Sequence, residues 1–142
     1  MKKLILIVED NLANRLPMAR LLRTEGFETF CARNGQDALD ALKFMQPDLI
    51  LLDLMMPAMG GVEFLKILRS DPFRADLPVI VFTGLAPHDD AIAAAQRLGA
   101  KDCFRKADFT FDRLLTAIRR HLQTSPVGGR HDGPWAQRRD VC

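Results

Sequence analysis

The sequence predicts a doubly wound α/β fold, in which helices cover both faces of a five-stranded parallel sheet. Five short apolar runs recur along the chain, and each is followed by a stretch long enough for a helix. Because parallel strands need long right-handed crossovers, this alternation favours five successive βα units. With 142 residues, of which 48% are hydrophobic, the chain has the usual size of one domain.

The predicted strands are short runs rich in Val, Ile and Leu, as expected for strands that are buried on both faces. The third run is bounded by Asp48 and ends on a second carboxylate, Asp53, which therefore lies where the strand leaves the core. The five predicted strands are Leu4–Val8, Glu28–Ala32, Leu49–Leu52, Val79–Phe82 and Asp102–Phe104.

The segments between these runs carry apolar residues at helical spacing together with signals for helix ends. Gly26 and Gly99 each follow a predicted helix and are typical C-cap residues. We expect Asn14 to cap the first helix, because Pro17 would then lie in the first turn, where its missing N–H costs no helical hydrogen bond. The predicted helices are Arg15–Glu25, Gln36–Met45, Gly61–Arg69, Pro87–Leu98 and Phe111–Leu122.

After Leu122 the chain is rich in Gly, Pro and Arg and loses its periodicity, so we expect a domain over residues 1–122 and a flexible tail over residues 123–142. Such a tail is too short for a DNA-binding domain. The net charge of +2 has no long run of either sign, so nucleic acid is not expected as a direct partner. The apolar run Leu4–Val8 is too short for a signal peptide or membrane span, which predicts a cytoplasmic protein without membrane contact.

The cysteines and histidines carry two further predictions. The cysteines are few and widely spaced, a pattern that suits neither a disulfide framework nor a zinc site and that predicts reduced thiols. They are Cys31, Cys103 and Cys142. The histidines are expected to be solvated, and they are His88, His121 and His131.

Polar side chains follow the predicted strands at their carboxyl ends, the edge at which open α/β sheets bind ligands. Glu9 and Asp10 follow the first strand, Asp53 the third and Thr83 the fourth, and the fifth leads within two residues to Lys106. Clustered carboxylates repel one another, and a hard divalent ion such as Mg²⁺ would relieve the repulsion. Since a carboxylate can also attack phosphorus, our hypothesis is that Asp53 accepts a phosphoryl group.

Taken singly, each of these residues has an ordinary structural explanation. Asp10 can serve as a helix cap, Thr83 is a good strand former, and a lone Lys106 is typical of a solvated surface charge. These explanations do not account for five such residues at one edge of one predicted sheet.

The sequence resembles a known family, the receiver domain of two-component response regulators. The resemblance covers roughly Lys3 to Leu122 and rests on five ordered blocks. These blocks are ILIVEDN, NGQDALDAL, PDLILLDLMMPAMGGVEFLKILR, PVIVFTG and GAKDCFRKADF. The resemblance implies a flavodoxin-like (βα)5 fold with the strand order 2-1-3-4-5.

The resemblance also implies a role for each residue of the matching motifs. Asp53 would be the phosphoacceptor, Thr83 the hydroxyl that holds the phosphoryl group, and Lys106 the cation that pairs with it. The implied Mg²⁺ ligands are Glu9, Asp10, Asp53 and the backbone carbonyl of Met55.

Three positions depart from the family pattern. Cys103 stands where the family usually has Tyr or Phe, which puts the usual output coupling in doubt, and Phe104 should point to the opposite face of the strand. Ala107 stands where the family has Pro after a cis bond, so we expect a trans bond and a changed placement of Lys106. Gly60 replaces an acid and should make its loop more flexible.

The expected function is a phosphorylation-dependent signalling switch rather than an enzyme. Asp53 would receive its phosphoryl group from a histidine kinase or a histidine phosphotransfer protein. The chain, a monomer or weak homodimer, would then signal to a downstream effector protein by contact, with the fourth helix, fifth strand and fifth helix as the readout face.

The same residues bear on four alternative functions. Cys103 and Ala107 favour a receiver-like scaffold that acts without phosphorylation, and a receiver fragment of a longer regulator is also consistent with the sequence. A phosphohydrolase of the haloacid dehalogenase type needs a second acid two residues after its nucleophile, where this chain has Met55. An FMN binder needs a phosphate loop after the first strand, and EDNLAN would repel a phosphate.

Overall fold

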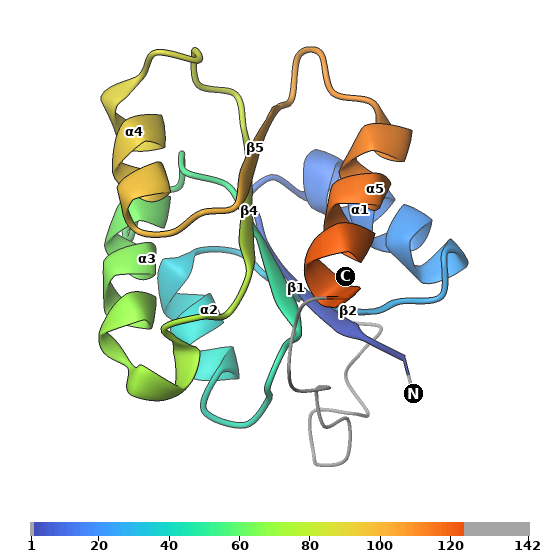
Figure 1. The fold of residues 1–142 in the computed structure, drawn as a ribbon, viewed down its shortest axis with the longest axis horizontal. Helices are drawn as coiled ribbons and strands as arrows, with labels where there is room; N and C mark the ends of the chain where they lie inside the picture. The colour runs from blue at the N-terminus through green and yellow to red at the C-terminus, as the bar shows by residue number, and fades with distance from the viewer. Residues whose placement is uncertain (1, 124–142) are drawn as a thin grey trace.

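The computed structural model describes residues 2–123, which form a five-stranded parallel sheet with helices on both faces (Figure 1). The strand order is β2-β1-β3-β4-β5, so the predicted fold class and the order implied by the resemblance are both confirmed. Two strands run one residue further toward their carboxyl ends than predicted. The strands are β1 (Leu4–Val8), β2 (Glu28–Ala32), β3 (Leu49–Leu52), β4 (Val79–Thr83) and β5 (Asp102–Arg105).

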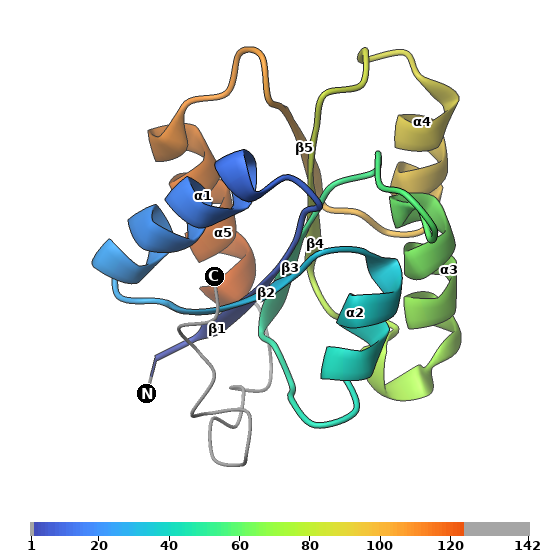
Figure 2. The same ribbon diagram turned by 180° about the vertical axis from the view of Figure 1, so that it is seen from behind.

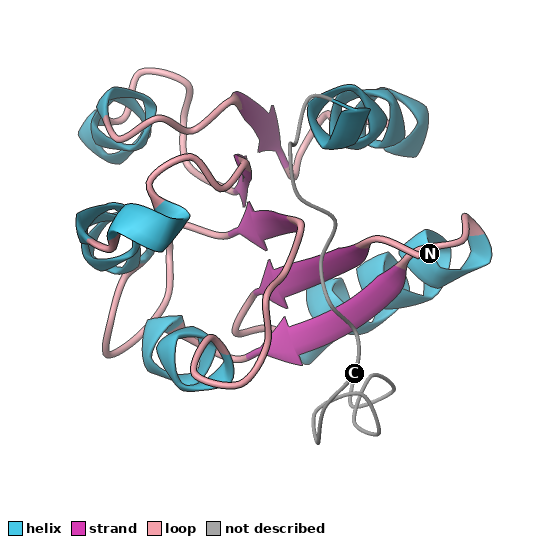
Figure 3. Ribbon diagram, turned by 60° about the horizontal axis from the view of Figure 1, so that its bottom comes forward, coloured by secondary structure: helices cyan, strands magenta, loops and turns pink. Residues whose placement is uncertain are grey.

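The helices divide into two layers. Figures 1 and 2 show α1 and α5 on one face of the sheet and α2, α3 and α4 on the other, and Figure 3 shows the same layers in a tilted view. The bounds are α1 (Leu12–Thr24), α2 (Gly35–Ala41), α3 (Gly61–Ser70), the short 3₁₀ helix η1 (Pro72–Arg74), α4 (Asp90–Arg97) and α5 (Phe111–Gln123).

Strand β1 shows why these runs are apolar throughout. Leu4, Leu6 and Val8 pack into the core under α2, α3 and α4, while Ile5 and Ile7 pack into the core under α1 and α5. Since successive side chains of a strand point to opposite faces, a strand covered on both faces needs an apolar residue at every position. All five residues of β1 are buried, as this argument predicts.

Helix α1 begins earlier than predicted. It starts at Leu12 and is capped by Asn11, whose side-chain oxygen accepts a hydrogen bond from the Ala13 backbone N–H at 2.9 Å, so the prediction of Asn14 as the cap is wrong. Pro17 therefore lies in the second turn, where it removes one helical hydrogen bond on an exposed face. Gly26 follows the helix with φ +94°, in agreement with the predicted C-cap.

Two other helices are shorter than predicted. Helix α2 is capped by the Asn34 side chain and ends at Ala41, and Met45, which was predicted to be its last residue, is instead a buried core residue beyond the helix end. Helix α4 begins at Asp90 with Asp89 as its cap, rather than at Pro87. The start of α4 is thus determined by its polar cap rather than by the apolar stripe.

The cysteines and histidines of the described residues agree only in part with the predictions. Cys31 is disulfide-bonded, which contradicts the expected reduced thiol, whereas Cys103 is free. His121 is partly buried and lies 2.7 Å from a carboxylate oxygen of Asp102, so it is not simply solvated. His88 is exposed as expected.

Among residues 2–123, no helix is long and apolar enough to cross a membrane.

The predicted domain boundary falls at the end of α5, which includes Gln123. The rest of the predicted tail, together with Cys142 and His131, lies outside the described residues.

Candidate functional site

Three acids meet at the carboxyl edge of the sheet because β1 and β3 are neighbours in register. Val8 pairs with Leu52, which places Glu9 beside Asp53, and the Asp53 backbone N–H donates to the Val8 carbonyl at 3.0 Å. One carboxylate oxygen from each of Glu9, Asp10 and Asp53 lies within 4.8 Å of the others. Glu9 and Asp53 are only 4% and 3% exposed, whereas Asp10 is exposed. The predicted acidic cluster is therefore present.

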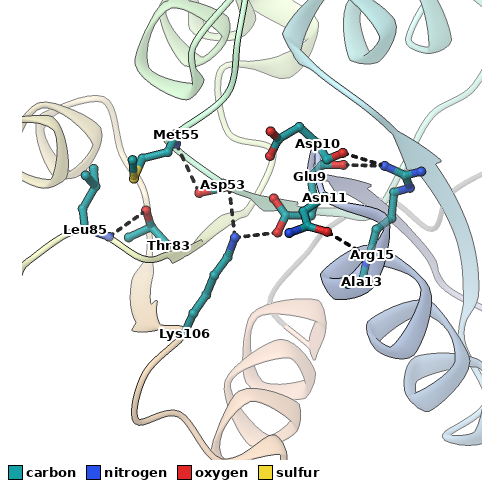
Figure 4. A network of polar contacts seen from close by, with 10 residues as sticks. All are labelled: Glu9, Asp10, Asn11, Ala13, Arg15, Asp53, Met55, Thr83, Leu85 and Lys106. Atoms are coloured by element: carbon teal, nitrogen blue, oxygen red, sulfur yellow. Dashed lines mark hydrogen bonds and ion pairs between the residues drawn. The ribbon is translucent and has the colours of Figure 1, made fainter.

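Lys106 reaches this cluster from the loop after β5. Its ammonium nitrogen Nζ lies 2.5 Å from Oε1 of Glu9 and 3.1 Å from Oδ2 of Asp53 (Figure 4). Its backbone N–H donates to the Thr83 carbonyl at 2.9 Å, which ties the loop to the end of β4. No peptide bond among the described residues is cis, so the bond before Ala107 is trans as expected. Lys106 nevertheless contacts both carboxylates.

The electrostatics of the site centre on Glu9. Burial raises the pKa of the Glu9 carboxyl to about 7, with Asp53 adding to the rise and Lys106 opposing it. Burial alone would lower the pKa of Lys106, but hydrogen bonds to Glu9 and Asp53 outweigh it, and the pKa is raised. Lys106 therefore stays charged and offsets part of the repulsion between the two buried acids.

One atom of the cluster lacks a partner. Glu9 Oε2 is buried and accepts no hydrogen bond from any described residue. An unpaired buried carboxylate oxygen is costly, and a cation beside Asp10 would give it a partner. The donor set consists only of oxygens, which suits a hard divalent ion such as Mg²⁺. The residues present therefore fit the predicted metal, with Glu9, Asp10 and Asp53 as candidate ligands.

Two further residues predicted for the site lie beside Asp53. The Met55 backbone N–H donates to Asp53 Oδ1 at 3.2 Å, while the role of its carbonyl stays a prediction. Thr83 is fully buried at the end of β4, and its hydroxyl oxygen accepts a hydrogen bond from the Leu85 backbone N–H at 3.3 Å. Figure 4 places Thr83 beyond Asp53 as seen from Glu9 and Asp10, in agreement with the strand order.

One polar side chain at this site, that of Arg15, was not predicted from the sequence. Arg15 donates from one guanidinium nitrogen to the backbone carbonyls of Glu9, at 3.0 Å, and of Asp10, at 3.3 Å. It was missed because the first helix was expected to begin at Arg15 itself. The signal was the Asn11 cap, which places Arg15 one turn into the helix and close to the strand end.

Besides Ala107, the two other departures from the family pattern are Cys103 and Gly60. Cys103 packs into the core under α2, α3 and α4, and Phe104 into the opposite core, so the predicted alternation is confirmed. Burial, with a contribution from Asp102, raises the pKa of the Cys103 thiol and keeps it neutral. Gly60 precedes α3 with an extended backbone. The greater flexibility expected of its loop stays a prediction.

The chain matches one family model and is similar to several known proteins. A family model described as the response regulator receiver domain matches residues 5–119. Sporulation initiation phosphotransferase F of Bacillus subtilis is 36% identical over 122 residues, which cover 86% of this chain and 95% of that protein. The polar-differentiation response regulator DivK of Brucella anthropi is 34% identical, with coverage of 86% and 98%. The regulatory protein AtoC of Escherichia coli is 40% identical, but the chain spans only 25% of its length.

Solved structures of a receiver domain and of a response regulator also superpose on this chain. The signal receiver domain of a signal transduction histidine kinase from Syntrophus aciditrophicus superposes with a TM-score of 0.79 at 30% identity, covering 87% of this chain and 92% of that one. The response regulator protein TrrA from Thermotoga maritima, solved in complex with Mg²⁺-BeF, has a TM-score of 0.71 at 29% identity, with coverage of 84% and 98%.

Proposed function

The chain belongs to the response regulator receiver domain family, and from this premise we propose that it is a phosphorylation-dependent switch whose phosphoacceptor is Asp53. The donor is a histidine kinase or a histidine phosphotransfer protein, and the readout is contact with a downstream effector protein. Receiver domains of this kind are signalling switches rather than classical enzymes, so the protein supplies an acceptor and a conformational response.

The observation that supports this proposal most directly is the pairing of a buried carboxylate with a single ammonium. Asp53 is held at the end of a buried strand, and Lys106 Nζ lies 3.1 Å from its Oδ2. A carboxylate oxygen of Asp53 attacks phosphorus, the bond between phosphorus and the donor breaks, and the donor leaves with the bonding electrons. Lys106 then faces the negative charge that the phosphoryl group brings.

The other residues have supporting roles. Mg²⁺ held by Glu9, Asp10, Asp53 and the Met55 carbonyl would neutralise charge on the phosphoryl oxygens. The Thr83 oxygen already accepts from the Leu85 N–H, so its own O–H stays available to donate to a phosphoryl oxygen. Phosphorylation shifts the population toward the state in which Thr83 and Lys106 hold the phosphoryl group, by the extra affinity of that state for it.

The proposal is tested by intact-mass measurement after incubation with acetyl phosphate, with and without Mg²⁺. We expect one added phosphoryl group on the native chain when Mg²⁺ is present, and none on Asp53→Asn. Asp112→Asn, which changes an acid in the first turn of α5, serves as the matched control and should be labelled like the native chain.

The same experiment separates this function from a phosphorylation-independent scaffold. A folded native chain that gains no phosphoryl group, under conditions that label another receiver domain, would contradict the proposal and favour the scaffold. Labelling of Asp53→Asn to the native extent would mean that another residue is the acceptor.

A further inference from the structure

The turn between β1 and α1 carries two of the candidate metal ligands, and a residue of the helix holds it in place. Arg15 lies one turn into α1 and folds back toward the end of β1 (Figure 4). One guanidinium nitrogen, Nη1, donates to the backbone carbonyl of Glu9 at 3.0 Å and to that of Asp10 at 3.3 Å. A single charged donor thus bridges two consecutive peptide groups.

Apart from Arg15, the hydrogen bonds within residues 2–123 anchor this turn at its two ends. The Glu9 backbone N–H donates to the Ala32 carbonyl at 3.0 Å, which ties the start of the turn to β2. At the other end, Asn11 caps α1, and its own carbonyl accepts from the Arg15 backbone N–H at 2.9 Å. Between these anchors, the peptide planes after Glu9 and Asp10 are oriented by the Arg15 side chain.

The orientation of these planes matters most for Asp10. Its side chain is exposed, and within residues 2–123 its carboxylate accepts no hydrogen bond. Because no other described side chain holds this carboxylate, the backbone from which it projects decides which positions it can reach. Groups that orient metal ligands without touching the metal typically change metal affinity by about 10–100-fold when they are removed.

We propose that Arg15 is a positioning residue for the divalent cation site, because it fixes the backbone from which Glu9 and Asp10 project. The inference rests on the proposed function, since it assumes that these acids bind the cation. It also predicts that removal of Arg15 lowers the affinity for the cation, which is the opposite of the effect expected from charge alone. Removing a positive charge near a cation site should strengthen cation binding by electrostatics alone, whereas loss of positioning should weaken it.

The test is an amide chemical-shift titration with MgCl₂ on the native chain and on Arg15→Met, Arg15→Gln and Arg15→Lys. We expect the affinity for Mg²⁺ to fall about tenfold in Arg15→Met and Arg15→Gln. Arg15→Lys keeps the charge and N–H donors and should recover part of the loss. Arg20→Met removes an exposed arginine from the same helix and should bind Mg²⁺ like the native chain.

A second readout separates positioning from general damage to the fold. If Arg15 acts through the cation site, saturating Mg²⁺ should restore labelling of Arg15→Met by acetyl phosphate to nearly the native rate. If Arg15→Met fails to fold, Arg15→Gln and Arg15→Lys are compared with the native chain by the same two measurements.

The outcomes are distinct. Unchanged or tighter Mg²⁺ binding in Arg15→Met and Arg15→Gln would overturn the inference and leave the proposed function standing. A labelling defect that persists at saturating Mg²⁺ would also overturn it. If the native chain itself bound no Mg²⁺, the metal assignment of the proposed function would fail, and the inference with it.

Discussion

At the scale of single residues, Glu9 has the most unusual environment of the three acids. It is buried, one of its oxygens contacts Lys106, and the other has no partner among the described residues. Burial raises the pKa of the Glu9 carboxyl to about 7, so a large part of the Glu9 population carries a proton near neutral pH. A cation at this site must displace that proton, and its affinity should rise with pH.

The raised pKa of Glu9 predicts how stability depends on pH in the absence of metal. Between about pH 4.5 and about pH 7 the folded protein keeps a proton that the unfolded chain has lost, so the contribution of Glu9 to the free energy of unfolding falls as pH rises through this range. Urea unfolding of the native chain and Glu9→Gln, which does not titrate, measures the contribution as the difference between the two.

A matched substitution checks the assignment to Glu9. Glu63→Gln replaces an exposed carboxyl of α3 and should follow the native chain across the whole range. If Glu9→Gln also followed the native chain, Glu9 would not be the group responsible.

At the scale of elements, the connection between β3 and α3 is packed against the backbone that carries the acceptor. A Cβ atom added at Gly61, the first residue of α3, would lie 2.5 Å from the carbonyl oxygen of Asp53 and 2.7 Å from the Cα of Leu54. Both are backbone atoms, which cannot turn away as a flexible side chain can. The end of β3 and the start of α3 therefore act as one rigid support for Asp53.

This close contact predicts the effect of Gly61→Ala. Helix propensity favours alanine over glycine, yet we expect overpacking to lower the free energy of unfolding by about 1–3 kcal/mol and to slow labelling of Asp53. Urea unfolding and labelling kinetics measure the two effects. Gly84→Ala is the control, since nothing lies within 4 Å of a Cβ there. If Gly61→Ala instead had a higher free energy of unfolding than the native chain, the backbone of Asp53 and Leu54 would have to move easily to make room for the added Cβ.

The helix ends show where local patterns are insufficient. The apolar stripes predicted all five helices, but α1 begins three residues before the predicted Arg15 and α2 ends four residues before the predicted Met45. An apolar stripe shows which face of a helix is buried, but it does not show where the helix ends. A loop residue that also packs inward, such as Met45, extends the stripe beyond the helix. Caps decide the ends, and Asn11 and Asn14 are equally good caps as residue types.

At the scale of the whole molecule, Lys106 connects the ends of four structural elements. It follows β5, its ammonium contacts the residues after β1 and β3, and its backbone bonds to the last residue of β4. The two ammonium contacts depend on carboxylates that a phosphoryl group on Asp53 would disturb, while the backbone bond to β4 does not. Lys106 is therefore the residue best placed to pass a change at Asp53 to β5 and, through it, to the predicted readout face.

This connection predicts that Lys106→Ala separates phosphorylation from its conformational effect. We expect the variant to be labelled at Asp53 but to lose most of the amide chemical-shift changes in α4 and β5 that labelling causes in the native chain. Lys101→Ala removes an exposed lysine just before β5 and should keep the native response. Equal shift changes in Lys106→Ala and the native chain would contradict this role.

The sequence by itself determined the fold class, all five strands to within one residue, and the five polar side chains that lie at the strand ends or directly beyond them. These properties are local, because burial on both faces favours apolar runs, and the charged residues of this site follow directly where such a run ends. The strand order 2-1-3-4-5 was predicted from the resemblance to receiver domains and not from the residues alone. Only the tertiary structure decided that Lys106 bridges Glu9 and Asp53, that the Glu9 carboxyl has a raised pKa, that Arg15 folds back onto the β1 turn, and that Gly61 packs on the Asp53 backbone. Each depends on distances between atoms that different strands and helices bring together, and no spacing along the chain encodes those distances.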